Sequence, residues 1–104
     1  MHAQIFRKMA RFTIRIELHG AEPNDYPALH KAMEHAGFLC TITSTEGIVY
    51  KLPKAEYSLI GPYTFDQAFA KAKKAAATIG EPLSILATEV AGFRKFLNLD
   101  KAEE

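Results

Sequence analysis

Apolar and polar residues alternate without a break along residues 12–19, and this pattern constrains the fold more than any other feature of the chain. Successive side chains of a β-strand point to opposite faces of the sheet, so strict alternation indicates one buried face and one polar face. The apolar positions are Phe12, Ile14, Ile16 and Leu18, and the polar positions are Thr13, Arg15, Glu17 and His19. The apolar face needs a covering layer, which the helical segments of the chain can provide.

Two segments have the spacing of amphipathic helices. The first is predicted over residues 26–36, where Gly37 suits the left-handed turn that ends a helix. Its inward stripe consists of Leu29, Ala32, Met33 and Ala36. The second helix is predicted to begin at Thr64, which can form a capping box with Gln67, and to end at Gly80.

Three further strands are predicted at residues 38–43, 55–61 and 83–88. The resulting order, β-α-β-β-α-β, is the ferredoxin-like plan. We therefore expect an α+β sandwich with a four-stranded antiparallel sheet, both helices on one face, and the other face free for a partner. Residues 90–99 are expected to form a short amphipathic C-terminal helix.

A chain of 104 residues is expected to form one domain, which we place at residues 11–99. Residues 1–10 are expected to be flexible and residues 100–104 to be frayed. Cys40 is the single cysteine, which excludes an internal disulfide and a cysteine-based metal cluster. No apolar run approaches the ~20 residues that cross a bilayer, and no signal-peptide pattern is present, so a cytoplasmic protein is expected.

The sequence contains no strong catalytic motif, because its glycines are scattered singly and no Gly-x-Ser-x-Gly turn occurs. The histidines His2, His19, His30 and His35 lack metal-ligand spacing, and we expect neither a metal nor another cofactor. The third strand offers only Tyr57 for base stacking, which argues against an ordinary RNA-recognition motif.

Two hypotheses concern the polar face of the sheet. In the first, this face is a dimer or protein interface, with Leu39 and a neighbouring Ile60 or Leu59 supplying apolar contacts. In the second, the rim of the sheet near the end of the first strand performs acid–base chemistry.

Glu17, His19 and His30 could converge at that rim, because the first helix begins after the loop that follows the first strand. Metal-independent RNA cleavage needs a base for the 2′-hydroxyl, an acid for the leaving oxygen and a cation for the phosphorane. A histidine could be the acid or the base, and Arg15 the cation. The simpler alternative is that Glu17 pairs with Arg15 or with a lysine across the sheet.

Two segments of the chain resemble the GhoS family of small antitoxins from type V toxin–antitoxin systems. The first, residues 37–60, has a Phe that opens the second strand, then Glu46-Gly47-Ile48, then Leu52 in a polar arm. The second, residues 84–97, has a strand, a short acidic step and a Phe-Arg-x-Phe tail.

The resemblance implies the ferredoxin-like fold, a dimer, and an endoribonuclease that cuts the mRNA of a small membrane toxin. The functional arginine on the family's first helix falls at His30 here, and a histidine cannot replace a permanent cation at neutral pH. The family's acidic residue at the end of the first strand corresponds to Glu17 or His19.

Taken together, the residues and the resemblance predict a GhoS-like antitoxin that engages RNA, with a non-catalytic module for a protein partner as the alternative. The catalytic candidates are Glu17, His19 and His30. The candidate phosphate contacts are Arg11, Arg15, Lys71, Lys74 and Arg94.

Overall fold

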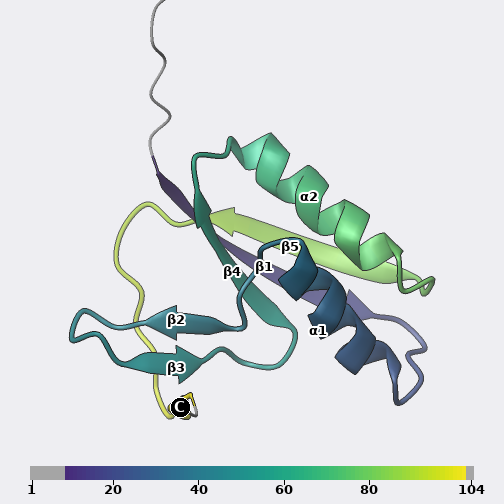
Figure 1. Cartoon of the computed structure of the whole chain (residues 1–104), viewed down its shortest axis with the longest axis horizontal. Helices are drawn as coiled ribbons and strands as arrows, with labels where there is room; N and C mark the ends of the chain where they lie inside the picture. The colour runs from purple at the N-terminus through teal and green to yellow at the C-terminus, as the bar shows by residue number, and fades with distance from the viewer. Residues whose placement is uncertain (1–8, 103–104) are drawn as a thin grey trace, which may run out of the picture.

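β1 (Ala10–Leu18) is the central strand of a three-stranded antiparallel sheet in this computed structural model, which describes residues 9–102 (Figure 1). It pairs on one side with β4 (Glu56–Gly61) and on the other with β5 (Leu83–Glu89). The predicted alternation is confirmed, since Phe12, Ile14, Ile16 and Leu18 are buried. The polar positions of β1 therefore lie on the opposite face of the sheet.

The helices α1 (Asp25–His35) and α2 (Phe65–Ala77) contact each other and cover one face of the sheet (Figure 1). Their apolar stripes form one buried cluster with the inward-facing residues of β1 and β4. The buried helix residues are Leu29, Met33, Ala68, Ala72, Ala75 and Ala76. The expected α+β class, with two helices and an antiparallel sheet, is confirmed.

The capping box at the start of α2 is present as predicted. The Gln67 N–H donates to Thr64 Oγ1 (3.1 Å), and the Thr64 N–H donates to Gln67 Oε1 (2.9 Å). The two side chains thus satisfy two backbone donors that a helix start leaves without partners. At the end of α1, Gly37 takes the predicted left-handed conformation, with φ +97°.

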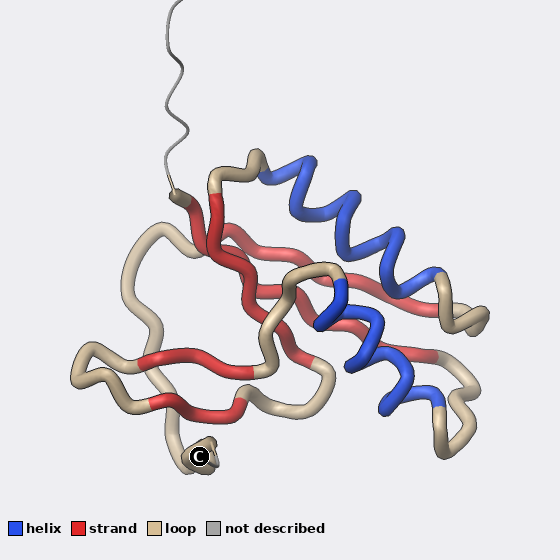
Figure 2. The backbone as a smooth tube through the Cα atoms, in the orientation of Figure 1, coloured by secondary structure: helices blue, strands red, loops and turns tan. Residues whose placement is uncertain are grey.

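β2 (Thr41–Thr43) and β3 (Val49–Lys51) form a separate antiparallel hairpin instead of completing a four-stranded sheet (Figure 2). The segment before β2 touches β4 at one bridge, where Leu39 and Ser58 exchange two backbone hydrogen bonds of 2.8 and 2.7 Å. The buried Ser58 hydroxyl then donates to Thr41 O (2.9 Å). The Thr41 carbonyl thus accepts a hydrogen bond from the Ser58 side chain and not from the backbone of β4. The backbone of β2 pairs with β3.

The chain after β5 runs as an irregular extended segment, residues 90–102, which is called the C-terminal strap below. At one end of the strap, the Val90 N–H donates to Arg11 O of β1 (2.8 Å). At the other end, the Lys51 N–H of β3 donates to Asp100 O (2.8 Å). The strap therefore joins the main sheet to the hairpin.

The prediction of a C-terminal helix at residues 90–99 is wrong. A ten-residue helix is only ~15 Å long, whereas an extended chain of the same length spans about twice that distance. Anchors on two different sheets favour the extended form, and an isolated helix this short is marginal in water. The expected frayed tail also differs, because the Ala102 N–H donates to Val49 O (2.9 Å), while residues 103 and 104 lie outside the described residues.

The flexible N-terminal segment expected at residues 1–10 falls largely outside the described residues, which begin at Met9. Ala10 is the first residue of β1 and pairs with Gly61 of β4. Within residues 9–102, neither helix has the length and apolar character that a transmembrane span requires.

Candidate nucleic-acid interface

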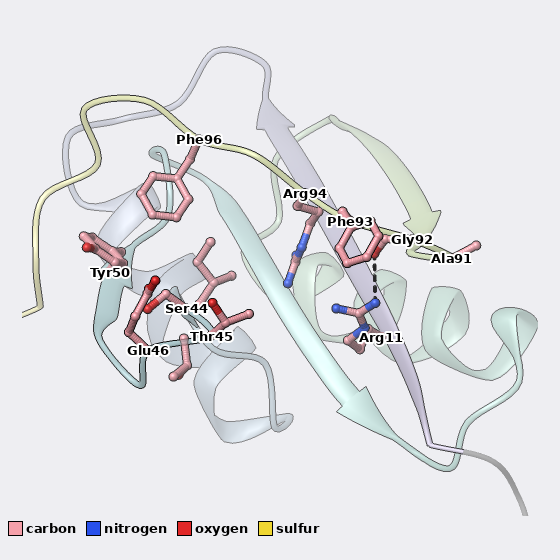
Figure 3. Close-up of a pocket in the computed structure, with 12 residues that line it drawn as sticks. Arg11, Ser44, Thr45, Glu46, Tyr50, Ala91, Gly92, Phe93, Arg94 and Phe96 are labelled. Carbon is pink, nitrogen blue, oxygen red and sulfur yellow. Dashed lines mark hydrogen bonds between the residues drawn. The ribbon is translucent and has the colours of Figure 1, made fainter.

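The polar face of β1 carries Thr13, Arg15 and Glu17, as the alternation predicted, and Arg11 extends the same face toward the start of the strand. From the sequence, this face is expected to be free. Instead, the C-terminal strap crosses it beside Arg11 and Thr13, on the side away from the helices (Figure 3). Any partner of this face therefore meets the strap as well as the sheet.

Two arginines hold the strap against the sheet. Arg11 Nη2 donates to Gly92 O (3.0 Å), and Arg94 Nη1 donates to Thr13 Oγ1 (3.1 Å). One arginine thus reaches from β1 to the strap, and the other reaches from the strap to β1. Both of these predicted phosphate contacts come together on one surface (Figure 3).

A hollow of about 620 Å³ lies between the strap, β1 and the hairpin. On its hairpin side, the rings of Tyr50 and Phe96 are 4.6 Å apart and tilted by 52°. Phe93 is fully exposed to solvent and lines the same hollow as Arg11 (Figure 3). The lining residues are Arg11, Ile42, Thr43, Ser44, Thr45, Glu46, Tyr50, Ala91, Gly92, Phe93, Arg94 and Phe96.

The hollow has an excess of positive charge. Its lining contains two arginines, Arg11 and Arg94, and one carboxylate, Glu46, which lies on the hairpin side (Figure 3). The oxygens that the two guanidiniums contact, Gly92 O and Thr13 Oγ1, are neutral. Burial lowers the pKa of Arg94, the charge of Arg11 lowers it further, and Glu56 acts in the opposite direction. An anion near both guanidiniums would relieve their repulsion.

The catalytic candidates do not converge. His30 lies on α1, and a 2.5 Å hydrogen bond joins its Nδ1 to Tyr57 Oη. Tyr57 is fully buried on the helix-covered face, whereas Glu17 lies on the opposite face of the sheet. The predicted convergence of His30 with Glu17 and His19 is therefore wrong, because the sheet separates them.

The environment of His30 disfavours its charged form. Burial lowers the pKa of the His30 imidazole, and the nearby positive charge of Lys54 lowers it further. A hydrogen bond to a buried tyrosine gives this histidine a structural partner, which links α1 to β4.

His19 follows β1 and is exposed. A 2.8 Å hydrogen bond joins His19 Nε2 to Ser84 Oγ, and Ser84 pairs with Glu17 in the β1–β5 ladder. His19, Glu17 and Arg15 thus belong to the strap-bearing side of the sheet, at the end of β1 away from Arg11.

The lysine candidates lie on the helical layer. Lys71 of α2 is half-buried, and its Nζ lies 5.8 Å from the centre of the Tyr63 ring. Lys74 is exposed on the same helix. The predicted phosphate contacts therefore divide between two sides of the protein, and only the arginines share a surface with the hollow.

The aromatic residues of this surface, Tyr50, Phe93 and Phe96, were not among the site residues predicted from the sequence. Phe93 and Phe96 belong to the segment 90–99, which was expected to be an amphipathic helix. In residues 93–96, two aromatic residues flank two basic residues, and this pattern is the sequence signal that could have indicated an interface. Of the apolar candidates for a dimer face, Ile60 and Leu39 are exposed, whereas Leu59 is buried against the helices.

Residues 9–102 contain no group of three or more His, Cys, Asp or Glu side chains placed to hold a metal ion. Comparison with known protein families, with curated proteins and with solved structures finds no match for this chain. The resemblance to the GhoS family therefore rests on the sequence patterns alone.

Proposed function

We propose that this chain is an RNA-binding protein, built on the ferredoxin-like plan and acting as a GhoS-like antitoxin on the mRNA of a small membrane toxin. The observation that carries the proposal is the pair Arg11 and Arg94, which share one surface with exposed aromatic rings and donate to the neutral oxygens Gly92 O and Thr13 Oγ1. Proteins that bind single-stranded nucleic acids commonly combine basic side chains that contact the phosphates with aromatic rings on which the bases stack.

The strand arrangement supports the ferredoxin-like plan. The sheet order is β4-β1-β5, and the Leu39–Ser58 bridge places the segment before β2 next to β4. Continued pairing along that segment would give the strand order of the plan, with β2 at the outer edge.

A salt titration with matched variants tests RNA binding. Fluorescence anisotropy with a labelled RNA should give an affinity that falls as salt rises, because bound arginines release counterions. Arg94→Gln should weaken binding and lower the slope of log affinity against log salt by ~0.7, the value for one lost contact to a single strand. Lys74→Gln, on the helical layer, serves as the control and should leave both quantities unchanged.

An affinity that responds to Lys74→Gln and not to Arg94→Gln would move the site to the helices. A chain with no RNA affinity but a concentration-dependent mass would favour the rival function, a homodimer or protein-binding module. The exposed Leu39, Ile60 and Leu86 side chains would then be the apolar contacts of the sheet.

RNA cleavage is a second candidate function, and the position of His19 favours it. His19 lies on the same side of the sheet as Arg15, so an RNA bound across that side would meet an imidazole and a guanidinium. Incubation of structured and AU-rich RNAs with EDTA should give cleavage by the parent protein and by His30→Gln, and none by His19→Gln. Intact RNA in every reaction would leave binding without catalysis, and loss of cleavage in His30→Gln alone would reject this assignment.

A further inference from the structure

We propose that the hollow beside the C-terminal strap binds single-stranded RNA, with an unpaired base stacked on the Phe93 ring and the adjoining phosphates on Arg11 and Arg94. This inference rests on the RNA-binding function proposed above and names the form of RNA that the site accepts.

Phe93 is the first reason for a stacking site. Its side chain is fully exposed, more than any other large apolar side chain described in residues 9–102. Its backbone neighbours are held in place, because Gly92 O accepts from Arg11 and the Arg94 side chain donates to Thr13. The ring is thus presented to solvent on an anchored backbone, which suits it to accept the face of a base.

The unused donors of the two arginines are the second reason. A guanidinium has five N–H donors, and one hydrogen bond from each arginine is accounted for by the strap and by β1. Within the described residues, no further hydrogen bond occupies the remaining donors, so they can bind phosphate oxygens, which arginine contacts in a bidentate manner. The bonds that anchor the strap also orient the guanidiniums toward the hollow (Figure 3).

The shape of the hollow is the third reason. Its volume of about 620 Å³ lies within the size range of ordinary ligand sites, ~300–1,000 Å³. Tyr50 and Phe96 already pack against each other, so they form an apolar wall and leave Phe93 as the free ring. Bases in a duplex are stacked on their neighbours and cannot reach such a ring, whereas unpaired bases can.

The test compares Phe93 with another exposed apolar residue of the same strap. Leu97 is also largely exposed and has no aromatic face. A labelled 12-nucleotide RNA of mixed sequence should bind Phe93→Ala roughly 5- to 100-fold more weakly than the parent, which is the usual loss for one stacked base. Phe93→Tyr and Leu97→Ala should bind like the parent. The same RNA annealed to its complement should bind weakly and should not respond to Phe93→Ala.

A fluorescence measurement reports on stacking directly. The chain contains no tryptophan, so Phe93→Trp introduces a single indole at the proposed contact. Its emission should change on addition of the single-stranded RNA, whereas the emission of a Leu97→Trp control should not. Because both positions are exposed, these variants should retain the fold of the parent, which their thermal unfolding verifies.

The outcomes separate the two proposals. If the parent binds neither form of RNA, the proposed function fails and this inference fails with it. If the parent binds RNA but Phe93→Ala binds equally well and Phe93→Trp emission is unchanged, only the stacking site is overturned. Tighter binding of the duplex than of the single strand would also overturn it.

Discussion

The hydrogen bond between His30 and Tyr57 gives each of these two side chains a polar partner. Tyr57 is fully buried in β4, and a buried hydroxyl without a partner would destabilise the fold. The His30 imidazole on α1 supplies that partner. Burial raises the pKa of Tyr57, so its hydroxyl stays protonated at neutral pH and the pair is uncharged.

The lowered pKa of His30 predicts a pH dependence of stability. The unfolded chain, with an ordinary histidine pKa near 6.5, binds the His30 proton more readily than the folded protein does. The free energy of unfolding should therefore fall as pH drops through 6.5 toward the folded pKa. The imidazole is only partly buried, so solvent screening should keep the loss below about 1 kcal/mol.

Urea unfolding of the parent and of His30→Gln at pH 7 and pH 5 measures this effect. The parent should lose more stability between the two pH values than His30→Gln does, because the variant lacks the titrating group. His35→Gln, at an exposed position on the same helix, should keep the pH dependence of the parent. An equal pH dependence in the parent and His30→Gln would contradict the prediction.

At the residue level, the features that could be predicted are those that depend on neighbouring residues in the sequence. The alternation placed Thr13, Arg15 and Glu17 on the correct face, because each residue's face follows from its neighbours in the strand. The partner of His30 could not be found this way. Tyr57 lies 27 positions further along the chain, and only the packing of α1 on β4 brings the two together.

At the level of whole elements, α1, α2 and the three strands of the main sheet were predictable from periodicity, while the strap was not. The segment 90–99 has apolar residues at helical spacing, but the hydrogen-bond partners of the strap (residues 90–102) lie in β1 and β3, more than 40 positions earlier in the chain. Pairing with distant strands overrode the local pattern there. The Thr64–Gln67 capping box, in contrast, is built from neighbouring residues and formed as predicted.

The capping box predicts a stability loss that belongs to α2 alone. Thr64→Ala removes the acceptor for the Gln67 N–H and should lower the free energy of unfolding by about 1 kcal/mol. Thr45→Ala, at an exposed position in the hairpin turn, is the matched control and should change it by less than about 0.5 kcal/mol. Thermal or urea unfolding gives both values. Equal losses in the two variants would show that the box does not stabilise α2.

The molecule as a whole has two sides with different construction. On one side of the sheet, two helices bury a continuous core that includes Phe12, Leu29 and Ala72. On the other side, the strap is attached by a few hydrogen bonds and one aromatic contact. Segments with few buried apolar contacts open at lower free energy than the core does. The strap should therefore open without unfolding the rest of the protein.

Phe96→Ala tests this independence. The variant removes the ring contact with Tyr50, and such pairs contribute about 0.5–1.5 kcal/mol. Strap opening should then become about 2- to 12-fold more frequent.

Amide hydrogen exchange should accelerate by that factor at Lys51 and Ala102, whose N–H groups bond across the strap–hairpin contact. Exchange at the Ile16 amide, which bonds to Ala55 O within the core layer, should be unchanged. If the Ile16 amide also exchanges faster, the strap and the core unfold as one unit. That result would contradict the independent opening of the strap.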